Sequence, residues 1–150
     1  MGMLSGRILV AIDGTENSES AVTAATELSE KTGSEIHLIY VGEEITETQT
    51  PRSKGSDDEV GEEGQRLLDE KTRQIQSGGG VVGRSNLVPG SDPADEIVKL
   101  TRDEDVGIVV VGNRGLGPLK YAVRGSVSNT VVREAFCPVL VVRVDADLGG

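Results

Sequence analysis

The chain has 150 residues, enough for one domain with a single hydrophobic core and too few for a second. Apolar residues make up 36% of it and charged residues 27%, as in soluble globular proteins, and no apolar run is long enough for a membrane span. The formal net charge of −10 opposes nonspecific binding to nucleic acids, because phosphates repel an acidic surface.

The N-terminal segment, Met1–Gly6, lacks a basic stretch followed by an apolar core. We therefore expect no secretory signal and a cytoplasmic protein. Cys137 is the single cysteine, which excludes an intrachain disulfide and a thiolate metal cluster. His37 is the single histidine and lies in an apolar stretch, so we predict a packed strand residue rather than a ligand.

The acidic surface suggests a high-salt cytoplasm, because only five of the fifteen basic residues are lysines and aromatic residues make up 2% of the chain. At about 1 M salt the Debye length is only ~3 Å, so such a surface repels itself far less than in dilute buffer. We expect the melting temperature to rise between dilute and molar KCl. A melting temperature insensitive to KCl would contradict the halophile hypothesis.

Short β-branched runs alternate with longer helical patterns along the chain. This alternation predicts an α/β fold with an open parallel sheet and helices on both faces. The five expected strands are Arg7–Ile12, Glu35–Val41, Val81–Val88, Val106–Val111 and Val139–Val144. The fourth run is the most apolar, and we expect it at the centre of the sheet.

The first two predicted helices differ in how clearly they are marked. Ser18–Thr32 carries alanines and a leucine at helical spacing, and a glycine follows it. Asp57–Gln76 is less clear, because Gly61 and Gly64 lower its helical propensity. The polar stretch Gly42–Ser56 before it has no apolar periodicity and is predicted to be a mobile loop.

The last two helices have clear start signals. Asp92 suits the cap of the third helix, and Pro93 suits its first position. Ser126 is expected to cap the fourth helix, which cannot continue through Pro138. The ends of the chain, residues 1–6 and 145–150, are expected to be frayed.

Two loops are candidates for a ligand site. In an open parallel sheet with right-handed crossovers, a ligand sits beyond the carboxyl ends of the strands, where the strand order reverses. The order 3-2-1-4-5 would place Asp13–Thr15, after the first strand, beside Gly112–Gly125, after the fourth.

The second loop favours an anion. Its glycines let backbone amides approach phosphate oxygens, and the following helix N-terminus attracts negative charge. The segment Gly112–Ser126 has no acidic residue and carries Arg114, Lys120 and Arg124. A phosphate site is one interpretation. The alternative is that the glycines only form turns and Ser126 only caps its helix.

The spacing of this loop resembles that of a known family. Gly112, Gly115, Gly125 and Ser126 fill the pattern Gly, two residues, Gly, nine residues, Gly, Ser or Thr of ATP-binding universal stress proteins. The run into Asp13 and the segments Gly125–Val132 and Cys137–Val142 are similar to the family too, and the resemblance covers Arg7–Arg143. It implies a Rossmann-like, adenine nucleotide alpha hydrolase-like fold and an ATP-binding regulatory protein of the stress response with slow or no hydrolysis.

The resemblance also implies roles for individual residues. Asp13 would contact the ribose or adenine, and Ala11, Ile12 and Val41 would border the base. The ribose and phosphates, with Mg²⁺ as counterion, would be surrounded by Gly112, Arg114, Gly115, Gly125, Ser126, Val127 and Ser128. Asp13 has a structural alternative as a turn residue that hydrogen-bonds its own backbone. Family members often have a proline near Ala11 or Ile12, and this sequence has none.

The resemblance further implies a homodimer in which Val139–Val144 pairs with its twofold mate. A short apolar edge strand left bare would invite uncontrolled association. The alternative is an edge covered by the C-terminal tail.

Two other functions stay open. One is a nucleotide-free homodimeric interaction module of the same fold. The other is an adenylating or pyrophosphate-cleaving enzyme, which has little support because only Lys120 near the motif could act as a base or nucleophile. AMP or a cyclic nucleotide could replace ATP, and the sequence does not identify a protein partner.

Overall fold

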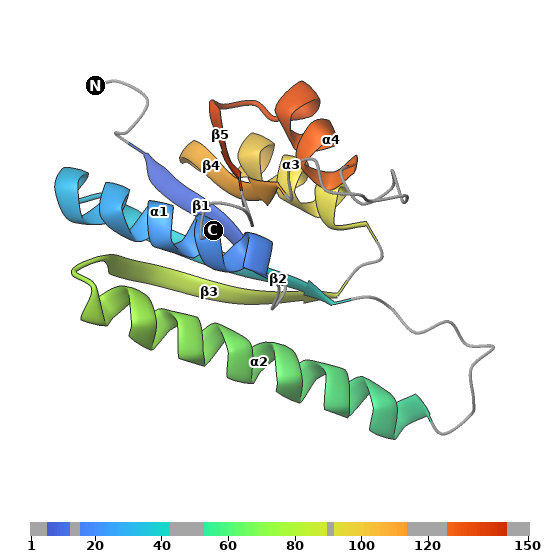
Figure 1. Ribbon diagram of the computed structural model, residues 1–150. Helices are drawn as coiled ribbons and strands as arrows, with labels where there is room; N and C mark the ends of the chain where they lie inside the picture. Colours follow the sequence, from blue (N-terminus) through green and yellow to red (C-terminus); the bar gives the residue numbers. More distant parts are fainter. Residues whose placement is uncertain (1–5, 13–15, 43–52, 90–91, 114–125, 144–150) are drawn as a thin grey trace, which may run out of the picture.

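The five described strands form one all-parallel sheet in the order β3-β2-β1-β4-β5. The computed structural model describes residues 6–12, 16–42, 53–89, 92–113 and 126–143 (Figure 1). Its elements are β1 (Arg7–Ile12), α1 (Glu16–Thr32), β2 (Glu35–Gly42), α2 (Ser53–Ser77), β3 (Val81–Pro89), α3 (Pro93–Asp103), β4 (Val106–Asn113), α4 (Ser126–Glu134) and β5 (Val139–Arg143). The predicted α/β class and strand order are confirmed.

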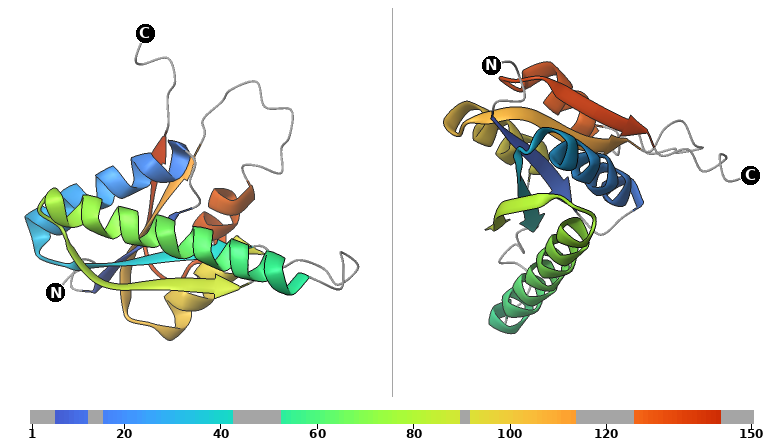
Figure 2. Two further views of the ribbon diagram at one scale, coloured as in Figure 1. Left: turned by 90° about the horizontal axis from the view of Figure 1, so that it is seen from below. Right: turned by 90° about the vertical axis from the view of Figure 1, so that its left-hand side faces the viewer.

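Helices cover both faces of the sheet, with α1 and α2 on one face and α3 and α4 on the other (Figures 1 and 2). Because successive strand residues point to opposite faces, each strand supplies side chains to two apolar clusters. The cluster under α1 and α2 includes Ile8, Val10 and Leu38. The cluster under α3 and α4 includes Leu9, Ile39 and Val109. These strands are buried on both faces, as their nearly continuous apolar runs predict.

The central strand is β1, and the prediction that the fourth strand lies there is wrong. β4 lies between β1 and β5. It also runs two residues past its predicted end, because Gly112 and Asn113 pair with Val142 and Arg143 of β5. Gly112 is therefore a strand residue rather than the first residue of a loop.

The start of α3 agrees with its local signals, whereas α1 begins at Glu16, two residues before its predicted start. Asp92 caps α3, with its Oδ1 accepting a hydrogen bond of 3.3 Å from the backbone N–H of Asp95. The start of α2 was misplaced, because it begins at Ser53 and includes four residues of the predicted loop. That first turn, Ser53–Ser56, contains no apolar residue, so periodicity could not mark it. The rest of the loop, residues 43–52, lies outside the described residues, as do the ends at 1–5 and 144–150.

Candidate functional site

The carboxyl ends of β1 and β4 lie at the same edge of the sheet. The two strands are parallel neighbours, with Val10 beside Val110 in register, so Ile12 and Gly112 follow at the same edge. β4 ends at Asn113 on this edge, and α4 begins at Ser126, the residue predicted to cap it. The strand order thus reverses between β1 and β4, which is the usual ligand position in such a sheet.

Three of the predicted site residues pack on one side of the sheet. Ala11, Val41 and Val127 are partly buried against the apolar cluster under α3 and α4. They come from β1, β2 and α4, so the fold gathers residues that are more than a hundred positions apart in the chain. Ala11 and Val41 are the last residues but one of β1 and β2, and Val127 is the second residue of α4. We call this group, near the carboxyl edge, the apolar wall.

Ile12 lies on the other side. It is 3% exposed and belongs to the cluster under α1 and α2, because strand alternation turns it away from Ala11. Its side chain is therefore not part of the wall, and only its main chain is available to a base that contacts Ala11 and Val41.

Val88 joins this wall and was missed in the sequence analysis. It pairs with Val41 in register and packs against the same cluster. Its place depends on the register between β2 and β3, for which the sequence contains no local signal.

The phosphate half of the predicted site is described only at its two flanks. Gly112 is half-buried in β4, and Ser128 in α4 is 5% exposed. Ser126 is the first residue of α4, and its side chain lies outside the described part of the structure. Asp13, Arg114, Gly115 and Gly125 lie outside the described residues.

The N-terminus of α4 is suited to an anion. This helix has no acidic residue in its first turn and a basic residue, Arg133, in its last. The backbone N–H groups of a helix start carry partial positive charge, which carboxylates in the first turn would offset. The flank that is described therefore fits a phosphate group.

A polar hollow of about 490 Å³ lies at the opposite edge of the sheet, where β1 and β2 begin. It is lined by Gly6, Arg7, Thr32, Gly33, Ser34, Glu35 and Asp105. Two of these side chains are carboxylates, so the hollow is a poor site for phosphate and is separate from the candidate nucleotide edge.

Two further groups in the described ranges bear on the chemistry, the potential metal ligands and the single thiol. These ranges contain no group of three or more His, Cys, Asp or Glu side chains that could hold a metal ion. Burial raises the pKa of the Cys137 thiol, which disfavours the reactive thiolate. None of the helices there has the length and apolar character that crossing a bilayer requires.

Comparisons with known proteins agree with this geometry. Residues 5–143 match the Universal stress protein family. Universal stress protein YxiE of Bacillus subtilis is 31% identical over 147 residues, which cover 91% of this chain and 98% of that protein. The solved structure of the hypothetical protein MJ0577 has a TM-score of 0.80 at 27% identity, covering 95% of this chain and 98% of its own.

The same fold appears in a crystal structure of a universal stress protein in complex with cAMP. It has a TM-score of 0.70 at 22% identity, and the alignment covers 93% of this chain and 98% of that one. The family match spans every strand of the described sheet. Membership of the family therefore no longer depends on the glycine spacing alone. The chain belongs to the universal stress protein family.

Proposed function

We propose that this protein is a cytoplasmic, ATP-binding universal stress protein that acts as a nucleotide-dependent regulator, with slow or no hydrolysis. The observation that carries the proposal is the convergence of β1, β4 and the start of α4 at one edge of the sheet. The complete glycine pattern of the ATP-binding members runs from Gly112 near the end of β4 to Ser126 at the start of α4.

The phosphates would lie at the start of α4. Gly112 and Asn113 end β4 on one flank of the segment that joins β4 to α4, and Ser126, Val127 and Ser128 begin α4 on the other flank. Backbone N–H groups there would donate to phosphate oxygens, and Arg114 would add a positive charge. Mg²⁺ would accompany the phosphates as their counterion.

The base would lie against the apolar wall formed by Ala11, Val41 and Val88. Asp13 follows β1 directly and would reach the ribose or adenine from the same edge. Ile12 would contribute only main-chain groups, since its side chain faces α1. The cAMP bound by the structural neighbour is a ligand of that protein, so AMP and cyclic nucleotides are competitors to compare with ATP here.

The experiment that tests this function is a thermal melt with and without magnesium-ATP. Molar KCl screens the acidic surface, and the protein is first shown to carry no nucleotide from purification. A ligand at a hundred times its dissociation constant stabilises the folded state by about 2.7 kcal/mol, which raises the melting temperature of a chain this size by roughly 5–10 °C. No rise would favour the nucleotide-free homodimeric module.

We also propose that the protein is a homodimer through the β5 edge. β5 is an outer strand of the sheet, and its Leu140 is an exposed apolar side chain (36% exposed). Two more exposed apolar side chains precede β5 in the chain: Val132 (52%) on α4 and Phe136 (64%) between α4 and β5. Alternation places Leu140 on the α1 face, while Val132 and Phe136 come from the α4 side. A second copy that continues the sheet would cover both sides of this edge.

Light scattering should give the mass of a dimer for the wild-type protein. Leu140→Lys is expected to shift it toward the monomer, because a charged side chain blocks edge pairing. Val81→Lys is the matched control, since Val81 is an exposed apolar residue (47%) on β3, the opposite outer strand. A wild-type monomer at working concentration would remove the dimer from the proposal.

A further inference from the structure

His37 is buried between two strands at the amino-terminal half of the sheet. It lies beside Leu9 of β1 and Arg84 of β3 in register, and it is 6% exposed. The expectation that it is a packed strand residue is confirmed. Its Nε2 is 3.7 Å from Oε1 of Glu35, which is too long for a hydrogen bond.

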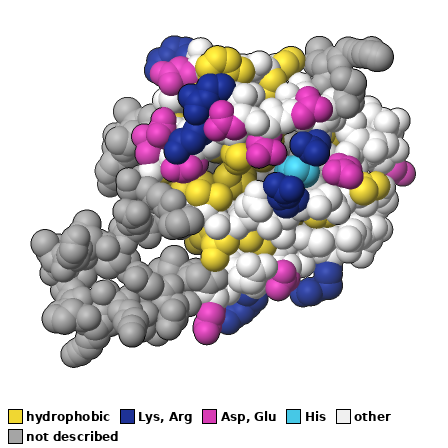
Figure 3. Space-filling model, turned by 180° about the vertical axis from the view of Figure 1, so that it is seen from behind, with side chains coloured by type: hydrophobic (Ala, Val, Ile, Leu, Met, Phe, Trp, Pro, Cys, Tyr) yellow, Lys and Arg dark blue, Asp and Glu magenta, His cyan; other side chains and the backbone are white. Residues whose placement is uncertain are grey.

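Charged side chains from four parts of the chain surround this imidazole. They are Arg7 at the start of β1, Glu35 on β2, Arg84 on β3 and Glu104 just after α3. Arg7 Nε is 4.0 Å from Glu35 Oε1, and Arg7 Nη1 is 3.9 Å from Glu104 Oε1. Figure 3 shows the small visible part of the histidine between basic and acidic side chains. Glu35 Oε1 is thus shared between an arginine and the histidine.

A β-bulge brings Arg84 to this face. Ile36 pairs with Val82 but His37 pairs with Arg84, so Gly83 is an extra residue on β3. Without the bulge, Arg84 would point to the same face as Val82, which packs under α1 and α2. A Cβ on Gly83 would stand only 2.2 Å from Oε1 of Glu35, so the carboxylate occupies the space that the glycine leaves.

The surroundings favour the neutral imidazole. Burial lowers the pKa of His37 most, and the charges of Arg7 and Arg84 lower it further, against smaller opposing effects of Glu35 and Glu104. We call the arrangement with β2 and β3 paired the closed state. The pKa of His37 in this state therefore lies below the ordinary value of 6.5. Stability from the closed state is complete above that value and is lost as the pH falls from it toward the closed-state pKa.

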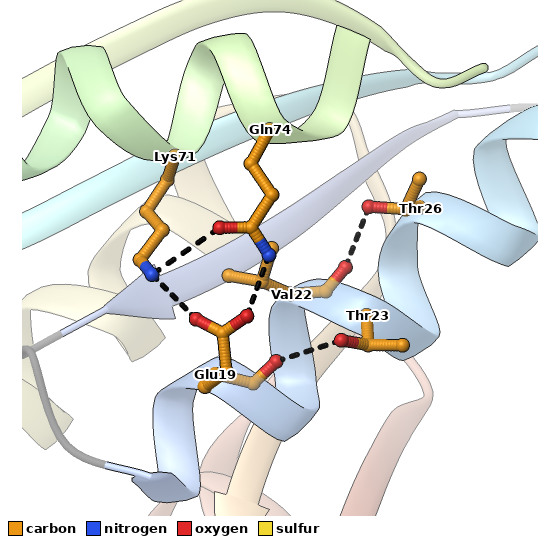
Figure 4. Close-up of polar contacts among 6 residues, drawn as sticks. All are labelled: Glu19, Val22, Thr23, Thr26, Lys71 and Gln74. Carbon is orange, nitrogen blue, oxygen red and sulfur yellow. Dashed lines mark hydrogen bonds and ion pairs between the residues drawn. The ribbon is translucent and has the colours of Figure 1, made fainter. Parts of the chain in front are cut away.

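The bulged segment is held at both ends. Before it, the backbone N–H of Val81 donates to Ser29 Oγ at 2.9 Å. After it, Leu87 of β3 lies close to Gly64 of α2. Helix α2 is in turn held to α1, because Lys71 and Gln74 of α2 donate hydrogen bonds to Glu19 of α1 (Figure 4). Since β3 is an outer strand, residues 82–85 can separate from β2 without disturbing β1, β4 or β5.

We propose that His37 is an acid-sensitive contact, whose protonation opens the β2–β3 pairing over the bulge at residues 82–85. Protonation of His37 adds a third positive charge beside Arg7 and Arg84. Opening the β2–β3 pairing lets water solvate the charged imidazole. The opened segment exposes an unpaired strand edge, so acidification changes the surface of the protein at the end of the sheet remote from the nucleotide edge.

The test combines NMR titration of the single histidine with hydrogen exchange of the full chain between pH 7.5 and 5.5. Histidine is the side chain whose ordinary pKa lies in this range, and His37 is the single histidine of the sequence. We expect a titration midpoint below 6.5 and faster opening of residues 82–85 relative to β1, by about tenfold for each unit by which the pKa is lowered. His37→Gln should remove the pH dependence.

Arg84→Gln keeps the test decisive should His37→Gln fail to fold. This variant should raise the titration midpoint, whereas Arg66→Gln, which removes the same charge from an exposed position on α2, should leave it unchanged. Each of three results would overturn the proposal. They are a titration midpoint of His37 at or above 6.5, an equal rise in hydrogen exchange for β1 and residues 82–85, and an unchanged pH dependence of exchange in His37→Gln.

Discussion

Gly115→Val is expected to abolish the rise in melting temperature that magnesium-ATP produces in the wild-type protein. Gly115 is the second glycine of the pattern in the segment between β4 and α4. A branched side chain at this place would keep the backbone amides away from the phosphate oxygens. The loss would be the full stabilisation of about 2.7 kcal/mol at a hundred times the wild-type dissociation constant.

Gly117→Val is the matched control for this experiment. It places the same side chain in the same segment, two residues further on, at a glycine outside the pattern. It should retain the shift with ATP, and both variants should melt like the wild-type protein without ligand. An equal shift in Gly115→Val and wild type would contradict the assignment of the phosphate site to this segment.

Gly64→Val is expected to lower the stability of the folded protein more than any other substitution proposed here. Gly64 is buried on the face of α2 that contacts the sheet, and an added Cβ would lie 2.7 Å from Leu87 Cδ1 and 2.9 Å from Tyr40 Cδ1. Valine would force α2 away from β2 and β3, at a cost of about 1–3 kcal/mol, well above the few tenths gained in helical propensity. The melting temperature should fall by roughly 2–4 °C per kcal/mol.

Gln65→Val separates packing from propensity, because Gln65 is the exposed neighbour of Gly64 on the same helix. Its melting temperature should change little. Leu87→Ala in the Gly64→Val background should recover part of the loss by making room for the valine. Equal melting temperatures for Gly64→Val and Gln65→Val would show that α2 does not approach the sheet as closely as the structure has it.

Gly64 also shows why the second helix was hard to predict. The glycines of α2 count against a helix when propensity alone is considered. Gly64, however, is the residue that lets α2 lie close to Tyr40 and Leu87. The tertiary contact outweighs the local preference. The first turn of the helix, Ser53–Ser56, was missed for a different reason, since it carries no apolar residue.

The candidate site, too, has features that the sequence predicts and features that only the tertiary structure shows. Strand alternation already separates Ala11 from Ile12, but the sequence does not say which face α3 and α4 cover. The structure places Ala11, Val41 and Val127 together, and adds Val88 through the register of β2 and β3. The central residues of the glycine pattern lie outside the described residues, so Asp13, Arg114, Gly115 and Gly125 stay predictions.

Local chemistry in the sequence was sufficient for the strand runs, the cap at Asp92, the start of α4 and the spacing from Gly112 to Ser126. These features depend on side chains and backbone groups only a few residues apart. The central place of β1, the extension of β4 to Asn113 and the bulge at Gly83 depend on which strand lies beside which, and in what register. Pairing between distant segments decides those features, because each is a property of two strands and not of one.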